Sequence, residues 1–300
     1  MALADAALLV RPAATVAPAP RRRKPLRRPL VVWCAVVGIF VVGGVAAPII
    51  SPYAYDLQNL GNQLRPPLWA GGTLDHVLGT DEFGRDILSR LLYGARASLL
   101  VGLLSVVLAG LIGISLGLIS GYRGGALDGF VMRVADIQYS FPYILLAIII
   151  AAFWGAGLIT LIVSLGLAGW ATFARTARGS ALSVRERDYV SAARALGASQ
   201  AHIITRHILP NIMAPLLVFT TFQVPSRILA EATLSFVGLG VQPPEPSWGN
   251  MLSQNRGYLI SQPWLVILPG LAIMLVAIAV NQLGDALRET LDPRMRGRTE

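Results

Sequence analysis

The chain has 300 residues, of which 54% are hydrophobic and 14% are charged, against about 25% charged residues in an ordinary soluble domain. Its mean hydropathy of +0.61 excludes a water-soluble globular domain and predicts a chain mostly embedded in lipid. The net charge is +9, but the basic residues lie in short stretches between apolar runs, which is typical of membrane topology signals and argues against a nucleic-acid partner. The single cysteine, Cys34, excludes an intramolecular disulfide.

A basic tail, residues 1–29, precedes the first apolar run, residues 30–50. A helix of about 20 apolar residues is long enough to cross a membrane. The basic stretch before the run also fits a cleaved signal peptide, but the run is longer than the roughly 7 to 15 apolar residues of such a peptide. We therefore predict an uncleaved first transmembrane helix, preceded by a cytoplasmic tail.

The second predicted span is residues 97–120, and Gly113, Gly117 and Gly121 recur every four residues along one of its faces. Small residues at this spacing let another helix approach closely. The apolar stretch 139–173 is long enough for a third and a fourth span, with a turn at the Gly-Ala-Gly of residues 155–157. The fifth and sixth spans are residues 212–239 and 264–283.

The distribution of basic residues orients these six spans. The segments 1–29, 122–139, 174–211 and 285–300 hold 19 of the 25 Lys and Arg residues. Arg and Lys accumulate on the cytoplasmic side of a membrane. Both termini are therefore predicted to be cytoplasmic, and the longest cytoplasmic loop is the segment 174–211.

Residues 51–96 form the first outer segment, and we expect them to end in an amphipathic helix at the membrane surface. Asp81 is its predicted N-cap, and Asp86 and Arg90 are spaced for an ion pair. The apolar stripe of this helix is Ile87, Leu88, Leu91 and Leu92. The helix either braces the outer mouth or contacts a protein that delivers substrate. Asp81, Glu82 and Asp86 also suggest a cation site, but a cap and an ion pair explain them more simply, so no metal site is predicted.

Within the cytoplasmic loop we predict two short helices separated by a glycine. Asp188 is the expected N-cap of the first, residues 189–196, and Gly197 ends it. Ser199 caps the second helix, which Leu209-Pro210 ends because the residue before a proline is displaced from helical geometry. One face of the first helix carries Tyr189, Ala192, Ala193 and Leu196. Such a face in the cytosol has to be covered by the underside of the membrane domain or by another protein.

The sequence contains no catalytic motif. A nucleotide-binding P-loop requires a Gly-Lys pair, and the only lysine, Lys24, follows Arg23. The histidines, His76, His202 and His207, lack the spacing of a metal hydrolase, and none lies in a predicted span where it would activate a serine. We therefore expect a transporter subunit rather than an enzyme, without a cofactor of its own, so that any ATP is bound by another chain.

The fifth span contains Gln223, Arg227 and Glu231. Charges are costly inside a membrane. Arg227 and Glu231 are one helical turn apart, so they either form a mutual ion pair or lie near the outer boundary. The alternative is that these residues face the translocation path and contact the termini of a peptide-like substrate.

The run from Asp188 to Gly197 (DYVSAARALG), followed twelve residues later by Leu209-Pro210, resembles the EAA motif of binding-protein-dependent ABC importer permeases. In that family the motif forms coupling helices that dock on the ATPase subunit. Ser191 stands where the motif has glutamate, and His207 where it often has isoleucine. The resemblance implies docking, within the coupling loop 174–211, by Asp188, Tyr189, Ser191, Ala192, Ala193, Gly197, Leu209 and Pro210.

Two further stretches narrow this resemblance. Residues 78–96, beginning LGTDEFGRD, look like the outer segment of the C-type permease of dipeptide and oligopeptide importers. Residues 235–249 are similar to the last outer loop of that subunit. The outer-face motif in the first stretch consists of Gly79, Thr80, Asp81, Gly84, Arg85 and Asp86.

The resemblance implies an all-α protein of the bacterial inner membrane with a type I, MetI-like transmembrane domain. Residues 97–284 are then a five-helix permease core, and residues 285–300 a cytoplasmic tail. The implied partners are a second homologous permease, two cytosolic ATPase subunits that bind ATP and magnesium, an extracytoplasmic substrate-binding protein and membrane lipid. Peptides are the expected substrate, with glutathione and nickel chelates as alternatives. The rival class is an ion-coupled secondary transporter, which the scarcity of carboxylates in most spans argues against.

Overall fold

The computed structural model describes residues 27–291, and this part of the chain is helical with connecting loops and no β-strand. The longer helices are α1 (Arg27–Val45), α3 (Ile87–Arg123), α4 (Gly125–Tyr139), α5 (Tyr143–Trp154), α6 (Leu158–Arg185), α9 (Leu209–Phe236) and α11 (Trp264–Leu291). The shorter ones are α2 (Ala47–Ile50), α7 (Asp188–Ala195), α8 (Gln200–His202), α10 (Trp248–Asn255) and the π-helix η4 (Ile203–Ile208). The 3₁₀ turns are η1 (Leu60–Asn62), η2 (Leu68–Ala70), η3 (Leu74–His76) and η5 (Arg256–Tyr258).

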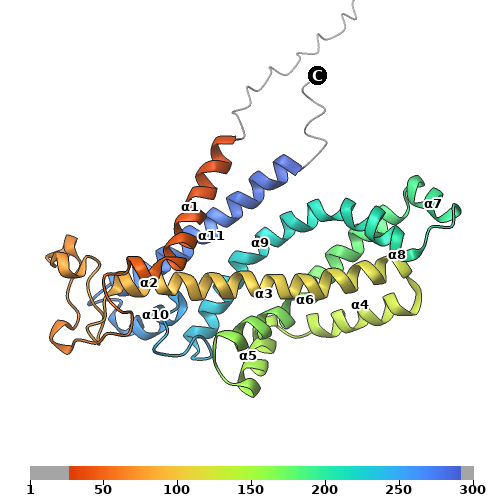
Figure 1. Ribbon diagram of the computed structural model, residues 1–300. Helices are drawn as coiled ribbons and strands as arrows, with labels where there is room; N and C mark the ends of the chain where they lie inside the picture. Colours follow the sequence, from red (N-terminus) through yellow and green to blue (C-terminus); the bar gives the residue numbers. More distant parts are fainter. Residues whose placement is uncertain (1–26, 292–300) are drawn as a thin grey trace, which may run out of the picture.

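The helices form an elongated bundle around α3, which runs along most of its length (Figure 1). α6 packs along α3, and α9 contacts both α3 and α11. α1 lies beside α11, and this pair leaves the bundle at an angle (Figure 1). We call the two ends of the bundle the α10 end, which also carries the loop of residues 51–86, and the α7 end, where α7 and α8 lie.

The glycine face of α3 packs directly against the backbone of α6. A Cβ atom on Gly113 would collide with the carbonyl oxygen of Trp170, and one on Gly117 would collide with that of Ala174. Glycine is required at both positions because any side chain would push the two helices apart. The close helix approach predicted from the glycine spacing is confirmed.

Within residues 27–291, four helices are long and apolar enough to span a membrane: α3, α6, the continuous helix 200–236 and α11. α4 and α5 pass the same test together but are bent by 88°, so they make a fifth span if the bent pair crosses. The apolar part of α1, Leu30–Val45, belongs to a shorter class of helix. The all-α membrane architecture is confirmed, while the count of six spans and the cytoplasmic termini stay predictions.

Two predicted boundaries are wrong. The expected outer amphipathic helix and the second span are one helix, α3, because the charge of Arg90 is buried and paired and does not have to stay at the surface. The predicted loop 174–211 is also shorter than expected, because α6 continues to Arg185. Its extension buries Ala174, Ala177 and Ala181 completely.

The turn predicted at residues 155–157 is confirmed, since α5 ends at Trp154 and α6 begins at Leu158. The third span, however, is not one straight helix. Pro142 separates α4 from α5, and a proline displaces the preceding residue from helical geometry.

α4 occupies most of the segment 122–139 that was expected to be a cytoplasmic loop. Arg178 of α6 holds α4 in place by donating two hydrogen bonds to the Asp128 carboxylate, at 2.5 and 2.6 Å. Hydropathy alone misses this helix because it carries such charged residues.

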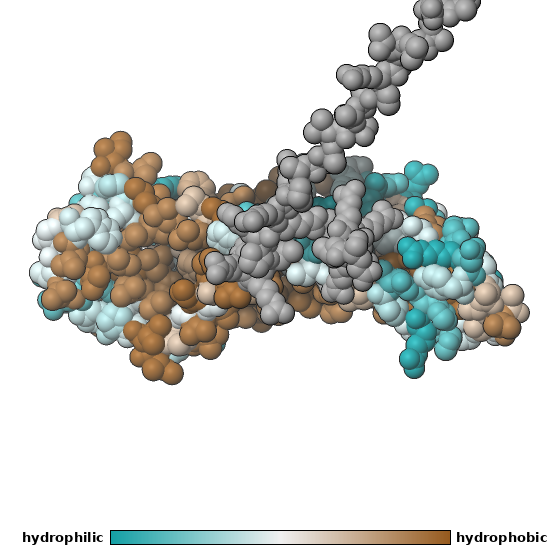
Figure 2. Space-filling view, turned by 90° about the horizontal axis from the view of Figure 1, so that it is seen from above, coloured by the Kyte–Doolittle hydropathy of each residue, from teal (hydrophilic) through white to brown (hydrophobic). Residues whose placement is uncertain are grey.

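Apolar side chains cover much of the outer surface of the bundle. Figure 2 shows them from the α10 end towards the middle of the molecule, whereas many hydrophilic side chains gather towards the α7 end. Leu103 and Leu111 of α3 and Ile267 and Leu271 of α11 are among the exposed ones. An apolar surface of this extent has to be covered by lipid or by other proteins.

Candidate functional site

α7 ends in a well-formed glycine cap. Gly197 has a φ of +80°, a conformation that glycine adopts without strain. Its N–H donates to the carbonyl of Arg194 at 3.0 Å, and the N–H of Ala198 donates to that of Ala193 at 3.1 Å, which is the Schellman pattern. The prediction that Gly197 ends this helix is confirmed. Asp188 is not the N-cap, however, because Arg187 holds that position and Asp188 is the first helical residue.

The predicted docking residues of α7 lie on an uncovered surface. Tyr189 is 40% exposed and Leu196 is 88% exposed. Asp188, Ser191, Ala192 and Gly197 are also exposed, and Ala193 is half-buried. The part of the chain that the structure describes therefore leaves this face open, so the underside of its own membrane domain does not cover it.

Val190 attaches the opposite side of α7 to the bundle. Its side chain is fully buried in a cluster that joins the ends of three long helices. The other buried members are Leu118 and Tyr122 of α3, Ala177, Ala181 and Val184 of α6, Ile203 and Ile208 of η4, and Ile212 and Leu216 of α9. Because protein interiors are closely packed, a displacement of α7 has to move these helix ends.

A side chain of α6 also closes the end of α3 beside this cluster. Nη1 of Arg185 donates to the carbonyl oxygens of Gly121 and Tyr122, at 3.2 and 3.1 Å. The last carbonyls of a helix have no partner within the helix. Arg185 therefore ties the ends of α3 and α6 together next to α7.

The second predicted helix of the loop begins as expected, since the Ser199 hydroxyl accepts the N–H of His202 at 3.3 Å. Leu209-Pro210 does not end it, because residues 200–236 form one continuous helix. The turn before Pro210 is the π-helix η4, and the N–H of Leu209 donates to the carbonyl of Ile204, five residues back. A proline crowds the carbonyl four residues earlier, and the wider π turn relieves this contact. Leu209 is half-buried and Pro210 is exposed.

At the α10 end, Asp81 is the centre of a buried network. Its Oδ1 accepts the N–H groups of Phe83 and Arg85 at 2.9 and 3.0 Å. Its Oδ2 accepts Nε of Arg85 at 2.7 Å and Nη1 of Arg90 at 2.9 Å. Oε1 of Gln254 on α10 accepts from both arginines, at 3.2 and 3.0 Å. The network therefore joins the outer loop, α3 and α10.

α3 has an N-cap and a buried ion pair, but different residues form them than the sequence predicted. Asp86, not Asp81, is the N-cap, and its Oδ2 accepts the N–H of Ser89 at 2.8 Å. The Oδ1 of Asp86 lies 3.0 Å from Nδ1 of His76. The predicted pair of Asp86 and Arg90 is wrong, because Arg90 binds Asp81 from the preceding loop.

The remaining residues of the outer-face motif fold the loop onto itself. Gly79 and Gly84 have φ values of +80° and +71°, and a Cβ on Gly84 would collide with the carbonyl oxygen of Asn59. The Thr80 hydroxyl accepts the N–H of Arg65 at 2.9 Å and donates to the carbonyl of Asn62. This motif therefore has a clear structural role.

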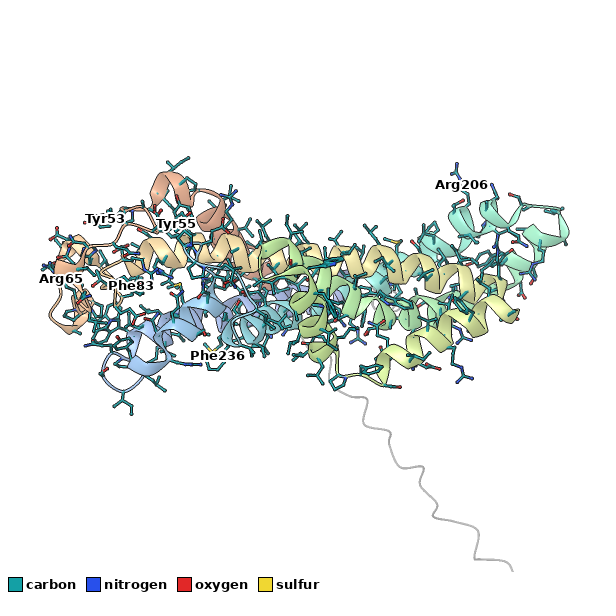
Figure 3. The ribbon with its side chains drawn as sticks, turned by 90° about the horizontal axis from the view of Figure 1, so that it is seen from below. Tyr53, Tyr55, Arg65, Phe83, Arg206 and Phe236 are labelled. Carbon is teal, nitrogen blue, oxygen red and sulfur yellow. The ribbon has the colours of Figure 1, made fainter. Side chains whose placement is uncertain are left out.

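Electrostatics also link the outer loop to η5. The hydroxyl of Tyr258 donates to Oε2 of Glu82 at 3.0 Å. This hydrogen bond raises the pKa of Tyr258, because the neighbouring carboxylate favours the protonated phenol. The shift therefore favours the phenol as a hydrogen-bond donor to Glu82. Figure 3 shows Arg65 and Phe83 of this loop at one end of the molecule and Arg206 at the other.

Two of the polar residues predicted in the fifth span meet at a pocket. Gln223 and Arg227 of α9 line a cavity of about 440 Å³ beside the bend between α4 and α5. Glu231 does not reach it, since its side chain is fully buried and accepts hydrogen bonds from Ser98 at 3.1 Å and Ser235 at 2.7 Å. The suggested ion pair of Arg227 and Glu231 is therefore wrong, because serine hydroxyls satisfy the carboxylate.

Residues 113–297 match the model of the family described as the binding-protein-dependent transport system inner membrane component. The chain belongs to this family. It is a permease subunit of an ABC importer and a multi-pass protein of the bacterial inner membrane.

The permease is similar to curated proteins over most of its length. It is 45% identical to a putative peptide transport system permease protein of Brucella suis, over 92% of this chain and 91% of the relative. It is 41% identical to the dipeptide transport system permease protein DppC of Alkalihalophilus pseudofirmus, over 89% and 86%. It is 39% identical to the glutathione transport system permease protein GsiD of Escherichia coli, over 86% and 84%.

The permease also resembles solved structures of the MetNI methionine ABC transporter in inward-facing conformations. One of them matches 66% of the permease and 94% of that chain, with a TM-score of 0.57 and 21% identity. A second matches with a TM-score of 0.54 and 22% identity, over 66% and 96%. This similarity confirms the type I, MetI-like fold.

Proposed function

We propose that this permease imports dipeptides and short oligopeptides, driven by ATP hydrolysis on separate subunits. The substrates named for its relatives support this class, because the similarity extends over most of each chain. Glutathione, named for another relative, is a tripeptide and belongs to the same chemical class. Nickel chelates remain the alternative cargo.

The observation that carries this proposal is the exposed face of α7. The glycine cap and the buried Val190 hold α7 in a defined position, yet Tyr189 and Leu196 are left exposed. We assign this face, with its neighbours, as the docking surface for a cytosolic ATPase subunit. The residues assigned to docking are Asp188, Tyr189, Ser191, Ala192, Ala193, Gly197, Leu209 and Pro210.

This assignment places the α7 end in the cytoplasm and the α10 end outside. The arginines of the α7 region, such as Arg187, Arg194 and Arg206, fit the preference of basic residues for the cytoplasmic side. The exposed apolar side chains of Trp69 and Ile260, in the loops of the α10 end, offer contacts for an extracytoplasmic substrate-binding protein. The exposed apolar helix surfaces suit a second permease subunit and lipid.

In the proposed mechanism, the two ATPase subunits close on ATP and push α7. Val190 transmits this displacement to the cluster that joins the ends of α3, α6 and α9. These helices then tilt and open the path outward, and hydrolysis returns them to the inward-facing arrangement. Magnesium and ATP remain on the partner subunits throughout.

Uptake by proteoliposomes containing the complete transporter tests this proposal. Labelled Ala-Ala should enter only with ATP and the binding protein present, and an ionophore that collapses ion gradients should leave the rate unchanged. Uptake driven by an ion gradient without ATP would instead identify a secondary transporter. Competition with glutathione and with a nickel chelate tests the substrate class, and a nickel chelate that enters when peptides do not would overturn the peptide assignment.

A further inference from the structure

A pocket that opens to the surface lies where the bend between α4 and α5 meets α6 and α9. Its volume of about 440 Å³ lies within the range of about 300–1,000 Å³ that small-molecule sites occupy. The side chains that line it include two tyrosines and several neutral hydrogen-bonding groups. Its polar lining includes Gln138, Tyr143, Thr172, Gln223, Ser226 and Arg227.

Arg227 brings an uncompensated positive charge to this pocket. Its side chain is almost fully buried, with a residue exposure of 5%, and its Nε has no hydrogen-bond partner. Among residues 27–291, no carboxylate forms an ion pair with it. Glu231, the acidic residue one turn away, is instead bound by Ser98 and Ser235. A charge buried in this way requires a partner that the described residues do not supply.

The neighbours of Arg227 hold its guanidinium in a fixed position. Its Cζ lies 5.5 Å from the centre of the Tyr143 ring, at the distance of a cation–π contact. A Cβ on Gly169 of α6 would collide with the guanidinium, so the absence of a side chain there makes room for it. Gln138 fixes the end of α4 to α6 by donating to the carbonyls of Leu167 and Ala168, at 3.0 and 2.7 Å.

We propose that Arg227 binds the carboxylate of a peptide substrate at a subsite inside the membrane. This inference rests on the proposed function and adds the group that recognises the cargo during passage. A guanidinium pairs with a carboxylate through two parallel hydrogen bonds, which gives both charge and geometry. Gln223, one turn before Arg227 on the same helix, and Ser226, which immediately precedes it, offer the neutral donors and acceptors that peptide amides require.

Protection of an introduced thiol tests this subsite without relying on the binding protein. The variant Ser226→Cys is combined with Cys34→Ser in the full transporter. The rate at which a maleimide labels the permease is then measured. Ser226 is exposed, so the reagent can reach this position. Ala-Ala should slow labelling at least threefold, whereas the same concentration of its C-terminal amide should not. Equal rates with both probes would overturn the proposal.

Substitutions at Arg227 and Gly169 show whether the guanidinium is responsible. Arg227→Gln should abolish the difference between Ala-Ala and its amide, and Arg227→Lys should restore part of it. Gly169→Ala should also weaken protection, because the new Cβ displaces the guanidinium. The matched control is Gly179→Ala on the same helix, where a Cβ would meet nothing within 4 Å and protection should be unchanged.

Three other outcomes are distinguishable. If a carboxylate of the second permease subunit pairs with Arg227, Arg227→Gln will reduce co-purification of the two permeases and Ala-Ala will give no protection, which overturns the subsite. ATP-driven uptake of Ala-Ala without protection also overturns the subsite but leaves the proposed function standing. Protection by Ala-Ala without ATP-driven uptake of any peptide supports the subsite and overturns the proposed function.

Discussion

Asp81 and Arg90 form an ion pair inside the protein. Nη1 of Arg90 donates to Oδ2 of Asp81 at 2.9 Å, and each side chain is 1% exposed. Asp81 lies in the outer loop and Arg90 is the fourth residue of α3, so the pair fastens the loop to the bundle. The same oxygen accepts Nε of Arg85, and one carboxylate therefore compensates two buried arginines.

Replacing Asp81 should destabilise the protein strongly. In Asp81→Asn both arginines lose their counter-charge, and removing one partner of a buried ion pair costs about 3–5 kcal/mol. The free energy of unfolding in detergent, measured by denaturant titration, should fall by about this amount. Asp75→Asn is the matched control, because Asp75 is exposed and forms none of the ion pairs found in residues 27–291. Equal stability of both variants would contradict the network.

The glycine face of α3 predicts a contrast between two identical substitutions. Gly117→Ala forces a methyl group onto the carbonyl of Ala174 and should destabilise by about 1–3 kcal/mol. Gly110→Ala, on the same helix, places its Cβ at an ordinary distance of 3.7 Å from Phe173 and should be neutral or stabilising, because alanine favours helix. Thermal unfolding in detergent measures both, and a Gly117→Ala protein as stable as Gly110→Ala would refute the close packing.

Local features were predictable from the sequence because their causes lie within a few residues. Gly197 ends α7 and Ser199 caps the next helix through bonds to residues at most five positions away. The turn at residues 155–157 likewise depends on its own glycines.

Features with distant partners could not be predicted in the same way. The continuity of α3 depends on Asp81 and on Gln254, which is 164 residues from Arg90. Nothing in the sequence around Gly169 indicates that this glycine makes room for Arg227, 58 residues later in the chain. The predicted N-cap, Asp188, is one residue away from the observed one, Arg187. Leu209-Pro210 does not end its helix because the π turn before it makes room for the proline ring.

A substitution at Val190 should separate ATPase docking on α7 from the transmission of its displacement to the long helices. Val190→Ala removes two buried methyl groups and leaves the exposed face of α7 in place, so it should lower stability by roughly 1–2 kcal/mol. The ATPase should still bind with unchanged affinity, while the amount of Ala-Ala imported per ATP hydrolysed should fall. Co-purification gives the affinity, and paired uptake and hydrolysis assays give the ratio. An unchanged ratio would show that force does not pass through this residue.

Gly197 tests whether the cap positions α7. In Gly197→Ala the added Cβ meets nothing within 4 Å, so the only cost is the positive φ, about 1–2 kcal/mol for a residue with a side chain. Peptide-stimulated ATP hydrolysis should fall because the end of α7 shifts. Gly179→Ala, at a helical position with equal free space, should leave stimulation intact. Full stimulation in Gly197→Ala would contradict the role of the cap.

This permease is proposed to receive its energy through the exposed face of α7. Leu196→Ser tests it most directly, because Leu196 is 88% exposed and its replacement should not affect folding. The control is Ile260→Ser, which changes a side chain that is 97% exposed at the opposite end. The measurement is co-purification of the ATPase together with peptide-stimulated ATP hydrolysis by the assembled transporter. Both should fall at least tenfold in Leu196→Ser, with ATPase binding retained in Ile260→Ser, whereas full binding and hydrolysis in Leu196→Ser would contradict the claim.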